Sequence, residues 1–219
     1  MHLGVIPDGN RRYADNHSMP KMKAYRKAKD LIKEIGPQLE DREIEEVSFY
    51  LLSEKNLQRS EEELQNLYQL LDESIEEIAE EFSDNGFSFN WATTKPEALP
   101  EYIQEKLERL EEEFDEGQKK VNALISYDGK KDILQASEEI ADEEYSRSSM
   151  LSNLQIGSNM DLVIRTGDNP SRECLSGFSI WNASYAEYYH IKKNFPAVEL
   201  KDVEEALDHF QELRRKKGR

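Results

Sequence analysis

Short apolar runs alternate along the chain with longer segments in which apolar residues recur every three or four positions. The short runs predict buried strands, and the longer segments predict helices that bury one face. Strands are predicted at 3–6, 46–52, 87–92, 121–127 and 160–166, and helices at about 13–35, 61–82, 101–118, 132–144 and 201–217. Gly36-Pro37 is expected to end the first helix, and Ser60 with Glu63 forms a capping-box pattern before the second. This alternation predicts an α/β fold with a mostly parallel central sheet flanked by helices.

Polar loops follow several of these strands. They are Asp8-Gly9-Asn10, residues 53–59 and residues 165–176. Ligands of parallel sheets bind outside the carboxyl ends of the strands, so we expect the three loops to converge on one side. The length of 219 residues and the lack of a repeat or linker predict a single domain that spans residues 1–219.

Composition narrows the function classes. The chain has 29 Lys and Arg against 46 Asp and Glu, a net charge of −17, which disfavours nucleic acid as a partner. Its single cysteine, Cys174, excludes an intramolecular disulfide and favours a reducing compartment. We find no export leader and no apolar run long enough to span a membrane, and we therefore expect a cytoplasmic protein.

Arginines occur near the strand ends of this otherwise acidic chain. They are Arg11, Arg12, Arg59, Arg165 and Arg172. Guanidinium groups match phosphate oxygens, so this placement indicates a phosphorylated ligand. Asp8 and Glu187 are candidate carboxylates for Mg²⁺, which binds one or two carboxylates together with substrate phosphates. On its spacing alone the Asp8-Gly9-Asn10 turn is more typical of a simple loop.

Five blocks of the sequence resemble, in family order, the signature blocks of the cis-prenyltransferases, the undecaprenyl diphosphate synthase family. They are HLGVIPDGNRRYA from His2, YLLSEKNLQR from Tyr50, LISYDGKKDI from Leu124, DLVIRTG from Asp161 and SGFSIWNASYAEYY from Ser176. The resemblance implies a single α/β domain with an apolar tunnel between sheet and helices, and a homodimer or a related heterodimer. It also implies Mg²⁺-dependent transfer of a prenyl group from an allylic diphosphate to isopentenyl diphosphate, forming a Z double bond. A lipid product further implies transient contact with a membrane surface.

The resemblance also implies roles for individual residues. The catalytic group would be Asp8, Asn10, Ser53 and Asn56. The allylic diphosphate would contact Gly9, Asn10, Arg11, Arg12, Lys21, Tyr25 and Arg59, and isopentenyl diphosphate would contact Arg165, Arg172 and Ser176. The metal would be held by Asp8 and Glu187, the latter often from across the dimer.

Several positions depart from the family pattern. Lys21 and Tyr25 stand where Arg and His are usual, and Lys55, Asp168 and Gly177 replace Glu, Gly and Asn. These changes suggest a divergent member of archaeal type, with an unusual donor, acceptor or product. Two alternatives remain open: transfer to another acceptor such as a prenyl alcohol, and a subunit of a heteromeric enzyme. A non-enzymatic binding module is less economical, because both candidate carboxylates are retained.

The tunnel walls are expected on the helix at 61–82 and the strand at 87–92. Candidate lining residues are Leu64, Leu67, Leu71, Ile75, Phe89 and Trp91. Each is equally typical of ordinary core packing. If Trp91 points inward, its bulk should shorten the product.

Overall fold

The computed structural model describes residues 1–40, 42–140, 145–169 and 173–216. A six-stranded sheet lies at its centre in the order β3-β4-β2-β1-β5-β6, and every neighbouring pair is parallel. The strands are β1 (His2–Ile6), β2 (Glu46–Ser53), β3 (Phe87–Ala92), β4 (Lys119–Tyr127), β5 (Leu162–Thr166) and β6 (Glu187–Ile191). The helices are α1 (Asn10–Asn16), α2 (Lys21–Glu40), α3 (Glu61–Asp84), α4 (Glu101–Glu113), α5 (Gly129–Glu139), α6 (Arg147–Asn153) and α7 (Leu200–Lys216). Short 3-10 helices are η1 (Glu54–Gln58), η2 (Pro96–Ala98) and η3 (Phe195–Ala197). The predicted α/β fold is therefore confirmed.

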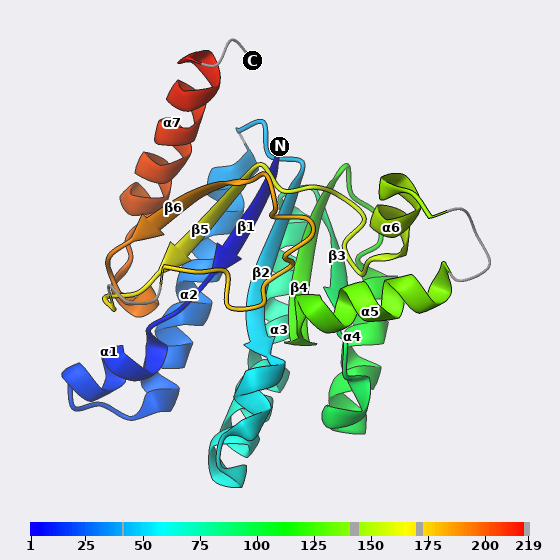
Figure 1. The fold of residues 1–219 in the computed structure, drawn as a ribbon. Coiled ribbons are helices and arrows are strands. Elements are labelled where there is room, and N and C mark those ends of the chain that lie inside the picture. Colours follow the sequence, from blue (N-terminus) through cyan, green and yellow to red (C-terminus); the bar gives the residue numbers. More distant parts are fainter. Residues whose placement is uncertain (41, 141–144, 170–172, 217–219) are drawn as a thin grey trace.

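The sheet separates two apolar layers. Figure 1 shows α2, α3 and α4 on one face, while α5 and residues 173–186, which lead into β6, lie on the other. Successive side chains of a strand point to opposite faces. Phe49 accordingly packs edge-on against Phe82 of α3, with ring centroids 5.7 Å apart, whereas Tyr50 packs against Phe178 at 5.3 Å on the other face. Alternation along β2 therefore supplies both cores.

The single helix expected at 13–35 is wrong at both ends. The structure has two helices, α1 and α2, and Ser18 between them adopts a positive φ of 49°. Pro20 directly precedes α2, a position where a missing N–H costs no helical hydrogen bond. The spacing of apolar residues does not predict the break between these two helices, which is visible only in the backbone conformation.

Gly36-Pro37 does not end the helix as expected, because Pro37 lies inside α2. A proline at an interior position removes one backbone hydrogen bond. In return, the last turn carries Leu39 into the core, where it is fully buried. Gly36 lies beside the ring of Phe82 of α3, so this part of α2 packs against that helix. Apolar burial outweighs the local stop signal here.

Two elements were missed by the sequence analysis, and two predicted helices have different bounds. β6 was missed although its Tyr188-Tyr189-His190-Ile191 run has strand character, and α6 was missed although Ser146 and Ser149 cap it reciprocally. α4 ends at Glu113 rather than at 118, and α5 begins at Gly129 rather than at 132. Residues 141–144, the predicted end of the latter helix, lie outside the described residues.

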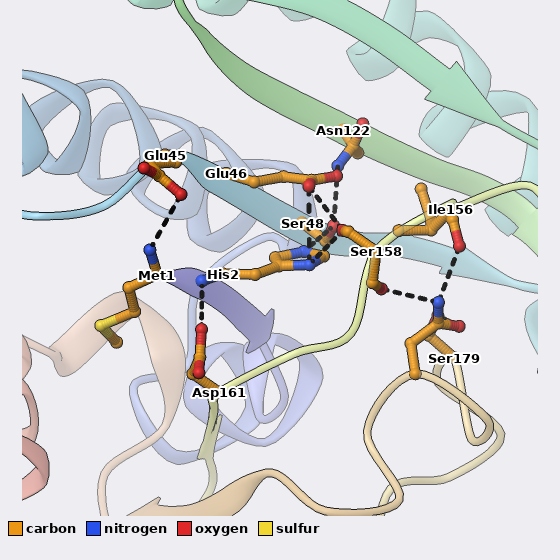
Figure 2. Close-up of polar contacts among 11 residues, drawn as sticks. Met1, His2, Glu45, Glu46, Ser48, Asn122, Ile156, Ser158, Asp161 and Ser179 are labelled. Carbon is orange, nitrogen blue, oxygen red and sulfur yellow. Dashed lines mark hydrogen bonds and ion pairs between the residues drawn. The ribbon is translucent and has the colours of Figure 1, made fainter. Parts of the chain in front are cut away.

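A closed ring of side-chain hydrogen bonds joins four segments at the amino end of the sheet (Figure 2). Asn122 donates to both Ser48 (3.0 Å) and Glu46 (2.7 Å), and Ser158 donates to Glu46 at 2.5 Å. His2 completes the ring, with Nε2 2.8 Å from Ser48 Oγ and Nδ1 2.8 Å from Ser158 Oγ. Because Ser158 donates to Glu46, it accepts from His2, and the neutral imidazole carries its proton on Nδ1.

Candidate active site

A cavity of about 980 Å³ opens where β1, β2 and β5 end. Residues that line its polar mouth include Asp8, Gly9, Asn10, Arg11, Arg12, Tyr25, Ser53, Asn56, Arg59, Glu63, Arg165 and Ser176. Apolar side chains of α2, α3 and β2 line the rest, among them Ala28, Ile32, Leu52, Leu67, Leu70, Leu71, Ile75 and Ile78. The three polar loops therefore converge as expected, and an apolar chamber lies behind them.

Asp8 and Arg165 form the buried polar centre of this mouth. Arg165 is the last residue but one of β5, beside β1, and its Nη2 donates to Asp8 Oδ2 at 2.5 Å. Its Nη1 donates to the Cys174 carbonyl at 2.5 Å and to Ser176 Oγ at 2.8 Å. Asp8 Oδ1 accepts from the Gly9 amide at 2.6 Å. The guanidinium is only 2% exposed, so its direction is fixed by these partners.

Gly9 is required at its position for two reasons. Its φ of 102° lies in the left-handed region that favours glycine, and a Cβ there would lie 2.2 Å from Asn194 Oδ1 and 2.8 Å from Asn194 Cα. Asn194 also donates to Asp168 at 2.7 Å. The loop after β6 is thereby packed directly against the backbone of the Asp8 turn.

Arg12 is held between two carboxylates. Its Nε donates to Asp168 Oδ1 at 2.8 Å, and its Nη2 lies 3.5 Å from Asp8 Oδ1. Partial burial opposes ionisation of Asp168, but the hydrogen bonds from Asn194 and Arg12 outweigh it and lower the pKa of Asp168. Asp168, a departure from the family pattern, therefore orients Arg12 at the mouth.

Glu63 gathers three cations at the other side of the mouth. Its Oε1 lies 3.2 Å from Arg59 Nη1 and 3.5 Å from Arg11 Nε, and its Oε2 lies 3.2 Å from Lys21 Nζ. Arg59 Nη1 also donates to the Tyr25 hydroxyl at 3.0 Å. Burial raises the pKa of Tyr25, although the nearby Arg59 opposes this shift, so the hydroxyl remains protonated at neutral pH. Sequence analysis identified Glu63 only as a capping residue, and its side chain contacts cations instead.

Ser53, Asn56 and Asn10, which the resemblance places in the catalytic group, have partners within the protein. The Ser53 amide donates to Asn56 Oδ1 at 3.0 Å, and the two residues cap η1 reciprocally. Asn10 Nδ2 donates to the Pro7 carbonyl at 2.9 Å, while its buried Oδ1 has no hydrogen-bond partner among the described residues. Asn10 thus presents an unsatisfied acceptor in the cavity wall.

Two predicted site residues do not join this cluster. Arg172 lies outside the described residues. Glu187 begins β6 and pairs in register with Leu162, whereas Asp8 follows the carboxyl end of β1. In a parallel sheet these positions lie at opposite ends of the strands. One chain therefore does not bring Asp8 and Glu187 together.

The mouth suits a hard cation that would be bound by one carboxylate of the protein and by the phosphate oxygens of the substrate. Over the described ranges, no group of three or more His, Cys, Asp or Glu side chains could form a metal cage. Among the carboxylates of the cavity, Asp8 lies beside Arg12 and Arg165 and is 20% exposed. Mg²⁺ commonly binds one or two carboxylates plus substrate phosphates, so this donor set suits it. Asp8 is the residue that would hold the ion.

The expected tunnel walls are only partly correct. Leu67, Leu71 and Ile75 line the cavity, but Leu64, Phe89 and Trp91 do not. Trp91 packs against the core from β3, with its amide 3.3 Å from Glu111 Oε1. β3 is separated from β1 by β4 and β2, so its side chains are remote from the mouth. Trp91 therefore fits the alternative of ordinary core packing rather than a place in the cavity wall.

No helix in the described part of the chain is long and apolar enough to cross a membrane.

Solved structures share this fold. Lavandulyl diphosphate synthase from Lavandula x intermedia, in complex with dimethylallyl diphosphate, superposes with a TM-score of 0.84 at 23% identity, over 95% of this chain and 94% of that one. A Campylobacter jejuni structure described as a probable undecaprenyl diphosphate synthase gives a TM-score of 0.80 at 25% identity, over 96% and 94% of the two chains.

The amino-acid sequence is also similar to those of prenyl transferases. The chain is 27% identical to an isoprenyl transferase of Campylobacter jejuni (strain RM1221), covering 100% of this chain and 98% of the relative. It is 29% identical to the tritrans,polycis-undecaprenyl-diphosphate synthase (geranylgeranyl-diphosphate specific) of Thermoplasma volcanium, covering 100% and 88%. Residues 6–218 match the Prenyltransf model of the undecaprenyl diphosphate synthase family. The chain is a transferase and belongs to this family, the cis-prenyltransferases.

Proposed function

We propose that residues 1–219 form one catalytic domain that transfers the prenyl group of an allylic diphosphate to isopentenyl diphosphate, with Mg²⁺ as cofactor. The supporting observation is the Asp8–Arg165 pair at the mouth of an apolar cavity of about 980 Å³. A cation-rich mouth suits the diphosphates, and the apolar chamber suits a prenyl chain. The single cysteine is consistent with a cytoplasmic enzyme.

The reaction breaks the C1–O bond of the allylic diphosphate, and the bonding electron pair leaves with the diphosphate. The double bond of isopentenyl diphosphate then attacks C1, and a proton leaves its C2 to give a new double bond of Z geometry. Bound Mg²⁺ would neutralise charge that develops on the leaving diphosphate. Groups fixed before the reaction stabilise such charge most effectively.

The chain's own residues divide this work between two diphosphate positions. Arg11, Arg12 and Arg59 would hold the allylic diphosphate, with Gly9 allowing its close approach to the backbone. Arg165 and Ser176 would hold isopentenyl diphosphate from the other side of Asp8. The buried Nε of Arg165 and Nη2 of Arg12 have no hydrogen-bond partner among the described residues, so donors remain for phosphate oxygens.

Glu187 would act at the metal from a second copy of the chain. Its position at the opposite end of the sheet from Asp8 supports a shared site over a site within one chain. β6 is an edge strand, which leaves this side of the sheet available to a partner. We therefore propose a homodimer whose lipid product leaves by transient contact with a membrane surface.

The proposed function is tested by incubating the purified chain with radiolabelled isopentenyl diphosphate, Mg²⁺ and one allylic diphosphate at a time. Butanol-extractable label that disappears with EDTA and in Asp8→Ala is the expected result. A folded wild-type protein that forms no labelled lipid with any donor would refute it. Label transfer from a labelled allylic donor to a prenyl alcohol, without isopentenyl diphosphate, would show a different acceptor.

A further inference from the structure

Glu63 is a carboxylate inside the region proposed to bind an anion. It lines the cavity mouth, its side chain is 12% exposed, and cations from three separate elements surround it. Its amide is capped by Ser60 Oγ at 3.3 Å, so the start of α3 does not depend on the Glu63 side chain. A different reason is needed for a largely buried carboxylate at this position.

The two carboxylate oxygens of Glu63 are engaged differently: Lys21 Nζ donates a hydrogen bond to Oε2 at 3.2 Å, whereas Arg59 and Arg11 contact Oε1 as ion pairs only. Oε1 is buried and has no hydrogen-bond partner among the described residues, although Arg59 and Arg11 lie within ion-pair distance. Arg11 is 50% exposed and Lys21 is 42% exposed, so both side chains can turn toward another anion. Because no hydrogen bond fixes the buried Oε1 to either arginine, these ion pairs can be replaced by pairs with another anion.

We propose that Glu63 is a positioning residue that competes with the substrate diphosphate for Arg11, Lys21 and Arg59, and thereby promotes release of pyrophosphate. The inference rests on the proposed function, because it assumes that these cations bind the allylic diphosphate. While the site is empty, the cations pair with Glu63. When the diphosphate binds, they turn to it, and when pyrophosphate leaves, Glu63 receives them again.

A competing effect, loss of preorganisation, would give the opposite result. If Glu63 served mainly to hold the cations in place, its removal would weaken anion binding. However, the Tyr25 hydroxyl holds Arg59 independently at 3.0 Å, and the half-exposed Arg11 is not rigidly held even with Glu63 present. Removal of a negative charge at ion-pair distance therefore dominates, and the site binds anions more tightly.

Loss of Glu63 should affect the release of pyrophosphate but not the condensation step. A site without Glu63 keeps the groups that bind and orient the allylic diphosphate, so the condensation step keeps its rate. Pyrophosphate, which carries more charge than the esterified diphosphate, dissociates more slowly from unopposed cations. Tight binding of a charged product lowers kcat without accelerating the chemical step.

The inference is tested by calorimetric titration of Glu63→Gln and wild type with inorganic pyrophosphate, a measurement that does not depend on enzyme activity. We expect Glu63→Gln to bind pyrophosphate about tenfold more tightly than wild type at low salt, with a smaller difference at high salt. Glu62→Gln is the matched control, because Glu62 is exposed on the same turn and has no ion pair in the described part of the chain. It should bind pyrophosphate as wild type does. If Glu63→Gln fails to fold, Glu63→Asp replaces it in the test. Its carboxylate lies farther from the cations, so it should bind pyrophosphate more tightly than wild type does, but by a smaller factor than expected for Glu63→Gln.

Kinetics provide the second readout. Glu63→Gln should show a lower KM for the allylic diphosphate and a lower kcat, while its single-turnover condensation rate stays at the wild-type value. Unchanged or weaker pyrophosphate binding in a folded Glu63→Gln overturns the inference, even if the enzyme is active. A wild-type protein that binds no pyrophosphate and forms no product overturns both this inference and the proposed function.

Discussion

Arg165 Nη2 lies 2.5 Å from Asp8 Oδ2, so the last residue but one of β5 is tied to the second residue after β1. The guanidinium is almost fully buried, while Asp8 keeps a fifth of its side chain exposed. The pair therefore faces the protein on one side and the cavity on the other. This arrangement makes Asp8 both a structural partner and the proposed metal ligand.

Replacement of Asp8 by Asn should reduce both stability and activity. Asn offers one neutral acceptor to a buried guanidinium, and loss of a charged partner costs about 1–3 kcal/mol, with the lower end favoured because Asp8 is partly exposed. Activity should fall at least about 100-fold, as expected when a group that stabilises transition-state charge is lost. Urea unfolding and label incorporation measure the two effects. Asp30→Asn, which removes a carboxylate that is 62% exposed, is the control. Near-wild-type activity in Asp8→Asn would contradict the proposed role.

Gly9→Ala should be more harmful than Gly86→Ala, although both glycines have positive φ. Gly86 has nothing within 4 Å of an added Cβ, so alanine there incurs only the conformational cost of about 1 kcal/mol. At Gly9 the same Cβ meets Asn194 at 2.2 Å, which also displaces the turn that carries Asp8. We expect a further loss of at least about 1 kcal/mol and much weaker allylic diphosphate binding. Equal free energies of unfolding for the two variants would show that the clash is relieved cheaply.

The free energy of unfolding should depend on pH through His2. Burial lowers the pKa of His2, although the nearby Glu46 and Asp161 carboxylates oppose the shift. Below the unfolded-state pKa of about 6.5 the unfolded chain binds a proton that the folded chain does not. Stability should therefore fall as pH drops below that value, by at most about 1.4 kcal/mol per pH unit.

Unfolding in urea at neutral and mildly acidic pH measures this slope. His2→Gln should be less stable than wild type at neutral pH, because the ring in Figure 2 is broken, but it should lose less stability on acidification. His17→Gln removes an exposed imidazole and is the matched control. Identical slopes in wild type and His2→Gln would exclude His2 as the cause.

Leu71→Trp should shorten the product, because Leu71 lines the chamber behind the mouth. A larger ring removes volume that a growing prenyl chain would occupy, at a cost of about 1–3 kcal/mol for overpacking. Trp91→Ala should leave the product length unchanged, because Trp91 is not part of the lining. Chromatography of dephosphorylated products gives the chain lengths. A shift with Trp91→Ala but not with Leu71→Trp would place the prenyl chain elsewhere.

Mixing two inactive variants tests whether the site is shared between chains. If Glu187 acts across a homodimer, Asp8→Ala and Glu187→Ala should each be inactive. Mixed dimers should regain activity, because one of their two sites then has both native carboxylates. Subunit exchange followed by the label assay measures this recovery, and light scattering reports the mass. Two inactive variants that never complement each other in exchanged dimers would refute a site shared between Asp8 of one chain and Glu187 of another.

The structure follows from the sequence where local signals determine it. Apolar runs predict five of the strands, and polar residues after β1, β2 and β5 predict the mouth. Local signals do not predict the positions that tertiary packing determines. Pro37 continues a helix because Leu39 is buried in the core, and Glu63 contacts Arg11 and Lys21, which lie far away along the chain.

The central position of β1 has a consequence for synthesis on the ribosome. β1 can pair with β2 soon after both emerge, but its other neighbour, β5, is made more than a hundred residues later. Domains begin to fold while translation continues. The Asp8–Arg165 pair can therefore form only after β5 has been made, and a nascent chain that still lacks β5 has the Asp8 turn without its buried arginine. The polar mouth of the cavity is therefore complete only after β5 has been made.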